Sequence, residues 1–92
     1  MKKIIMFYGR ECPHCHAMKK AVGLLEKRDD VMVEMVEVWH SEKNAKRMEK
    51  FKGMITKACG GGFGVPALVD EKKRRALCGE RKYEELKEWI GG

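Results

Sequence analysis

The chain has 92 residues, 43% of them hydrophobic, and its 20 Lys and Arg against 14 Asp and Glu give a net charge of +6. That length suits one domain with one core, and the hydrophobic share excludes a disordered chain. The basic residues are scattered among acidic ones, and no apolar stretch is long enough to cross a bilayer. We therefore expect a single domain over residues 1–92, acting as a monomer with neither nucleic acid nor a membrane as a partner.

The predicted elements begin with an apolar run that leads into a cysteine pair. Residues 2–8 are rich in β-branched and aromatic side chains, which predicts a buried strand. Apolar residues at helical spacing then predict a helix over residues 13–28. Pro13 suits the first turn of that helix, where its missing N–H loses no partner. Cys12 is therefore expected at the helix start, with Cys15 one turn further along.

The rest of the chain alternates predicted strands and helices. Strands are expected over residues 31–39, 65–70 and 74–78, and helices from residue 42 through the apolar position Ile55 and over residues 81–90. Gly53 should weaken or kink the middle helix. The predicted order is β-α-β-α-β-β-α, an α/β fold whose mixed four-stranded sheet has helices on both faces.

The cysteine pair carries the predicted chemistry. A helix N-terminus presents free N–H groups and a partial positive charge, which stabilise a thiolate on Cys12. Cys15 is close enough to form a disulfide with Cys12, and His14 between them can add charge or a hydrogen bond. Two cysteines at this spacing can also begin a zinc site, with a histidine or Cys59 as a further ligand. The residues alone leave open a redox pair, a metal site and a pair of inert thiols.

Three features together resemble the thioredoxin superfamily in its compact, glutaredoxin-like form. They are Cys12-Pro13-His14-Cys15 after the first strand, Val65-Pro66 at the start of the third, and Gly79 after the fourth. The resemblance covers essentially the whole chain. It implies strand order 2-1-3-4, the first and third helices on one face of the sheet, and a cis peptide bond before Pro66 beside the cysteine pair.

The resemblance also implies roles for individual residues. The catalytic tetrad would be Cys12, Pro13, His14 and Cys15, and the substrate-binding residues would be Gly64, Val65, Pro66, Gly79 and Arg10. Two interpretations stay open for Arg10, apart from the resemblance: a residue that steers an acidic substrate or favours the thiolate, and a plain surface charge. His14 and Gly64 stand where glutaredoxins usually carry Tyr and Thr, so only part of a glutathione-binding site is present.

The predicted activity is thiol–disulfide oxidoreduction. Cys12, as the exposed nucleophile, attacks a substrate disulfide, and Cys15 resolves the mixed disulfide. No bound cofactor or metal is expected. An upstream reductase, or glutathione as a co-substrate, would supply the electrons. The expected partner is a disulfide-containing protein or a small thiol substrate. The alternative is a metal-binding module. The apolar run after Met1-Lys2-Lys3 is too short for a secretion signal, so a cytoplasmic location is expected.

Two further cysteines, Cys59 and Cys78, are isolated in the sequence. In the fold that the resemblance implies, the fourth strand returns toward the active-site end, which places Cys78 there with Cys59 on the preceding loop. Three interpretations stay open for them: two small buried hydrophobic residues, a second redox pair, or a shared metal site.

Overall fold

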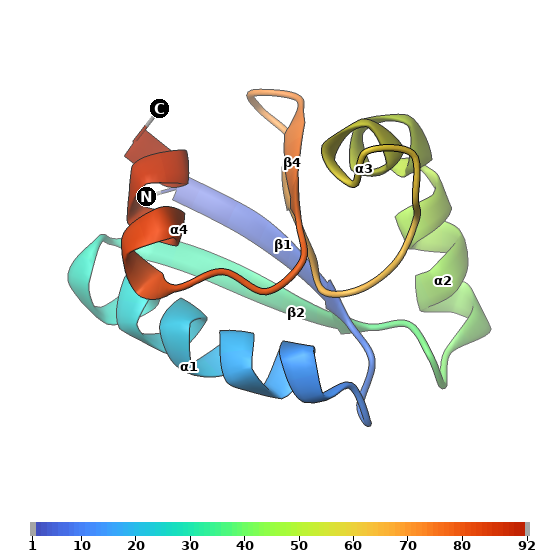
Figure 1. The fold of residues 1–92 in the computed structure, drawn as a ribbon, viewed down its shortest axis with the longest axis horizontal. Coiled ribbons are helices and arrows are strands. Elements are labelled where there is room, and N and C mark those ends of the chain that lie inside the picture. Colours follow the sequence, from blue (N-terminus) through green and yellow to red (C-terminus); the bar gives the residue numbers. More distant parts are fainter. Residues whose placement is uncertain (1, 92) are drawn as a thin grey trace.

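The structure, a computed structural model, describes residues 2–91 and is built on a four-stranded mixed sheet (Figure 1). The elements are β1 (Lys2–Tyr8), α1 (Pro13–Arg28), β2 (Val31–Glu37), α2 (Glu42–Glu49), α3 (Lys52–Ala58), β3 (Ala67–Asp70), β4 (Arg75–Cys78) and α4 (Tyr83–Gly91). The strand order is β2-β1-β3-β4, which confirms the predicted order. Strand β2 is parallel to β1, whereas β3 is antiparallel to both β1 and β4.

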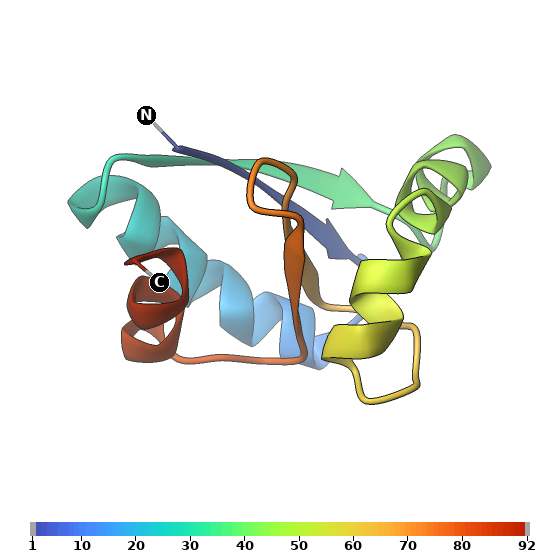
Figure 2. The same cartoon turned by 90° about the horizontal axis from the view of Figure 1, so that it is seen from above.

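Helices cover both faces of the sheet, as predicted, with α1 and α4 on one face and α2 and α3 on the other (Figures 1 and 2). The central strand β1 divides its side chains between two cores. Ile4 and Met6 pack toward α1 and α4, while Ile5 and Phe7 pack toward α2 and α3. This alternation, with apolar residues on both faces, explains the continuous apolar run in the sequence.

The middle helix is a correction to the sequence prediction, because one helix kinked at Gly53 was expected and two are present. Helix α2 ends before Lys50, and α3 begins at Lys52. The N–H groups of Lys50 and Phe51 donate to carbonyls three residues back, which tightens the last turn of α2. The break lets the Phe51 ring lie 5.9 Å from that of Phe7, centroid to centroid.

Several element boundaries also differ from the predictions. Strand β2 ends at Glu37 rather than residue 39, and β3 begins at Ala67 rather than residue 65. Pro66 has no N–H to donate to a ladder, and the chain before β3 follows a loop. Strand β4 begins at Arg75, because Arg74 adopts a positive φ of 51° in the hairpin turn. Helix α4 runs over Tyr83–Gly91 instead of residues 81–90.

Within residues 2–91, no helix combines the length and the apolar character needed to cross a bilayer.

Candidate active site

Cys12 is the N-cap residue of α1, with Pro13 in the first turn as the sequence predicted. The Cys12 backbone is extended, and its N–H donates to the Gly9 carbonyl at 3.1 Å. Its sulfur accepts the backbone N–H of Cys15 at 3.3 Å. A thiol sulfur thus takes the place of the usual capping oxygen, so the free N–H groups of the helix start point at Cys12.

Both cysteines of the tetrad are free thiols and both are buried. Cys12 is 5% exposed and Cys15 is 0% exposed. The expectation of an exposed Cys12 is therefore wrong, because Cys12 packs into the core on the α1 and α4 side of the sheet. Of the two residues, Cys12 is the slightly more exposed.

Cys15 lies in an environment that opposes its ionisation. Burial, followed by the hydrogen bond to Cys12, raises the pKa of Cys15 to about 12, although the nearby backbone of Gly9 opposes the shift. The negative charge of a Cys12 thiolate acts in the same direction as burial. The two thiols are therefore chemically unequal, and Cys15 stays protonated at neutral pH.

The ring of His14 contacts the segment that follows β4. Its Nδ1 lies 2.9 Å from Oε1 of Glu80, and both side chains are largely exposed. Glu80 is therefore a further functional candidate. The sequence did not indicate it as a partner of His14, because the two residues lie 66 positions apart. The pair links α1 to the residues that follow the edge strand β4.

The peptide bond between Val65 and Pro66 is cis, which confirms the prediction. Val65 packs against the core cluster that contains Cys12 and Cys15. The carbonyl of Pro66 accepts the N–H of Gly79 at 2.9 Å. Gly79 has a φ of 86°, a value that glycine adopts more easily than other residues. Glycine therefore suits the turn in which this hydrogen bond forms.

Arg10 lies on the exposed turn before α1, and its place is set by a carboxylate. The side chain of Glu37 accepts the backbone N–H groups of Arg10, Trp39 and His40 at 2.9, 3.1 and 2.8 Å. Desolvation opposes ionisation of Glu37, but these three N–H groups outweigh it and lower its pKa. Sequence reasoning missed this role of Glu37, one of two acidic residues in the strand β2.

A second pair flanks the same turn. The ring of His40 lies 2.6 Å from a carboxylate oxygen of Glu11, and this hydrogen bond lowers the pKa of Glu11. Next to it the indole of Trp39 covers Gly9 so closely that a Cβ on Gly9 would lie 2.2 Å from the ring. The close approach requires glycine at this position.

An apolar pocket of about 210 Å³ lies beside Gly64 and Val65, two of the predicted substrate-binding residues. Its other lining residues are Val38, Trp39, Ala45, Met48, Glu49 and Phe63. Trp39 and Phe63 are large and partly exposed, at 53% and 42%. Sequence reasoning missed both, because isolated aromatic residues in loops carry no pattern. Pro66, in contrast, is buried, so its side chain supports the loop from beneath.

A larger pocket, about 360 Å³, lies at the opposite end of β1 and β3, between Lys2, Lys3 and the 70–73 segment. Its buried carboxylate, Asp70, lies 3.3 Å from the Lys2 ammonium. This pocket is remote from both thiols, so we do not assign the cysteine chemistry to it.

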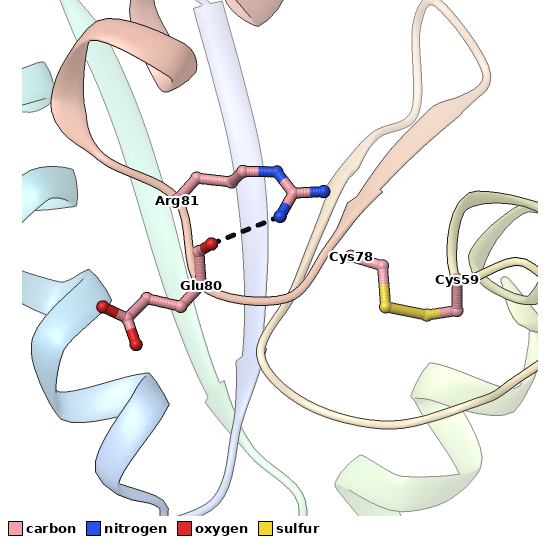
Figure 3. The surroundings of a disulfide bond; sticks show 4 residues. All are labelled: Cys59, Cys78, Glu80 and Arg81. Carbon is pink, nitrogen blue, oxygen red and sulfur yellow. Dashed lines mark hydrogen bonds between the residues drawn. A yellow bond between two sulfur atoms is a disulfide. The ribbon is translucent and has the colours of Figure 1, made fainter.

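Cys59 and Cys78 are joined by a disulfide, with their Cα atoms 5.1 Å apart (Figure 3). The interpretation as two free, buried cysteines is therefore wrong, because the end of α3 and the end of β4 lie side by side and both residues are half-buried. In this state neither sulfur is a thiolate ligand for a metal.

A metal site would need a cluster of donor side chains. Among the described residues, no group of three or more His, Cys, Asp or Glu is arranged to hold a metal ion. The histidines next to the thiols have other partners: His14 contacts Glu80, and His16 contacts the Arg10 carbonyl.

No protein-family model matches the sequence, and a search of curated proteins finds no match.

Proposed function

We propose that the protein is a thiol–disulfide oxidoreductase, in which Cys12 attacks a substrate disulfide and Cys15 resolves the mixed disulfide. The observation that carries the proposal is the position of Cys12: a free thiol at the N-cap of α1 whose sulfur accepts the N–H of Cys15. That N–H and the partial positive charge of the helix start stabilise negative charge on the Cys12 sulfur, the form that reacts.

In the first step the Cys12 thiolate forms a bond to one substrate sulfur, and the substrate S–S bond breaks. The other substrate sulfur leaves as a thiolate, which is a base and takes up a proton. Cys15 supplies that proton and then attacks the Cys12 sulfur. The second substrate sulfur leaves as a thiolate and takes up a proton from water, so the products are a reduced substrate with two thiols and an oxidised Cys12–Cys15 pair.

The order of the two steps follows from the unequal environments of the thiols. Burial raises the pKa of Cys15, and so do the hydrogen bond and the charge of Cys12. The contributions from Cys12 disappear once its sulfur is bonded to the substrate. Cys15 therefore becomes easier to ionise when its attack is needed, whereas its protonated form prevents early competition with Cys12.

The pocket beside Gly64 and Val65 supports a polypeptide as the substrate. Its apolar lining, with the rings of Trp39 and Phe63, suits a hydrophobic side chain next to the substrate cysteine. A low-molecular-weight thiol, such as glutathione, or a protein dithiol would return the Cys12–Cys15 pair to its reduced form. We propose the cytoplasm as the setting, because reductants of this kind are maintained there.

The test is to trap the mixed disulfide with single variants. Cys15→Ser should form a stable adduct with a peptide disulfide, seen as an added mass of one half of the substrate, because nothing resolves it. Cys12→Ser is the matched control and should form no adduct. Equal trapping by both variants, or trapping by Cys12→Ser alone, would refute the assigned roles.

A further inference from the structure

The Cys59–Cys78 disulfide is a sulfur centre separate from the Cys12–Cys15 pair. Cys59, at the end of α3, packs with the core on the α2 and α3 side of the sheet, whereas Cys12 and Cys15 belong to the core on the α1 and α4 side. Both half-cystines are only half-buried. The disulfide therefore lies outside the core cluster that holds Cys12 and Cys15.

The residues that follow Cys78 lead directly to the candidate active site. The N–H of Gly79 donates to the Pro66 carbonyl at 2.9 Å, and Oε1 of Glu80 lies 2.9 Å from Nδ1 of His14. Figure 3 shows the Glu80 carboxylate extending away from the disulfide, on the side of the chain toward α1. Two successive residues thus connect the disulfide to the cis-proline loop and to the cysteine tetrad.

The residues that follow Cys59 form the segment 60–66, which supplies Gly64 and Val65 to the apolar pocket. The segment is rich in glycine, and Gly60 and Gly61 adopt positive φ values of 71° and 113°. The N–H of Gly61 donates to the Thr56 carbonyl at 2.9 Å, which ends α3 in a turn. A glycine-rich segment has much conformational entropy to lose, so fixing Cys59, the residue immediately before it, to β4 restricts the segment.

We propose that the Cys59–Cys78 disulfide is a redox-controlled clamp on the active site. When it is closed, it holds segment 60–66 and the turn at residues 79–80 in the arrangement that binds substrate. A low-molecular-weight thiol opens it: two thiol molecules become one disulfide, and Cys59 and Cys78 gain two electrons and two protons to become thiols. The opened site binds substrate less well. This inference rests on the proposed function and assigns its regulation.

The first test follows the clamp alone in a Cys12→Ser/Cys15→Ser variant, with dithiothreitol as the reductant. The serine at position 12 retains a capping oxygen for α1. On reduction, amide hydrogen exchange at residues 60–65 and 79–80 should become at least about tenfold faster, and the ring resonances of His14 should shift. Exchange in β1 and β2 should stay the same.

Two results of this measurement would overturn the clamp. Unchanged exchange and unchanged His14 resonances would show that the disulfide does not reach the site. Equally faster amide exchange throughout β1 and β2 would show that the disulfide stabilises the whole domain and does not specifically control the loop.

The second test measures the reaction without any reductant. The rate at which a Cys15→Ser protein is trapped by a peptide disulfide is compared with that of Cys15→Ser/Cys59→Ser/Cys78→Ser. Opening the clamp should slow trapping by about fivefold or more, because displaced binding residues no longer align the substrate disulfide with Cys12 and mixed-disulfide formation becomes slower. Iodoacetamide labelling of Cys12 in both proteins is the control for a change in the thiol itself.

Equal trapping rates would overturn the clamp. If neither protein is trapped, the proposed function fails. The exchange measurement in the Cys12→Ser/Cys15→Ser variant still decides whether the disulfide controls the loop and His14.

Discussion

The buried thiol of Cys15 permits a quantitative test of the site. Burial, its largest cause, and the hydrogen bond to Cys12 raise the pKa of Cys15 from 9.0 to about 12. In a Cys12→Ser variant the contributions of the Cys12 thiol are lost, but burial remains, so the pKa should stay above 9.0. At neutral pH a thiol with a pKa of about 12 has about a thousandfold less thiolate than one with a pKa of 9.0, because each pKa unit changes the thiolate fraction tenfold.

The assay is alkylation of the Cys12→Ser variant by iodoacetamide, with and without urea. The Cys59–Cys78 disulfide does not react, so mass spectrometry reports Cys15 alone. Labelling of Cys15 in the folded protein should be at least tenfold slower than in urea, because a pKa raised by about one unit or more reduces the thiolate fraction by about tenfold or more. Its rate should also keep rising with pH beyond the point, near 9.0, at which the rate in urea levels off.

The matched control is Cys15→Ser, which leaves only Cys12 free. Cys12 should label faster than Cys15, because it is the more exposed of the two and receives the N–H at the helix start. Equal rates for Cys15 in the folded and unfolded chains, or a plateau near 9.0 in the folded chain, would refute the reasoning from burial.

Three other predictions rest on single positions. Gly9→Ala should force the Trp39 ring to move, because a Cβ would lie 2.2 Å from it, and should lower the free energy of unfolding by about 1–3 kcal/mol; an unchanged urea midpoint would contradict this. Gly79→Ala should cost about 1–2 kcal/mol in the same assay, since φ is positive there, whereas Gly53→Ala, which meets no atom within 4 Å, should not destabilise. Glu37→Gln should be less stable than wild type above pH 4.5, and the difference should vanish as pH falls through the lowered pKa of Glu37; a difference that persists in acid would argue against the charged cap.

Local patterns in the sequence were sufficient to predict the start of the site. The apolar run over 2–8 forms a strand because alternate residues serve two cores, and Pro13 begins a helix because it needs no donor there. These two facts place Cys12 at a helix N-terminus without any knowledge of the rest of the fold. The cis bond before Pro66 was predicted from the family resemblance, and the structure confirms it.

Contacts between distant residues decided what the sequence left open. The pairing of Cys59 with Cys78 depends on α3 lying beside the end of β4, and the pairing of His14 with Glu80 depends on β4 returning toward the start of α1. Neither follows from spacing along the chain. The burial of Cys12 likewise results from packing of the whole α1 face. Periodicity reports which face of an element is apolar, but the partner of a polar or sulfur atom is set by how the elements are arranged in space.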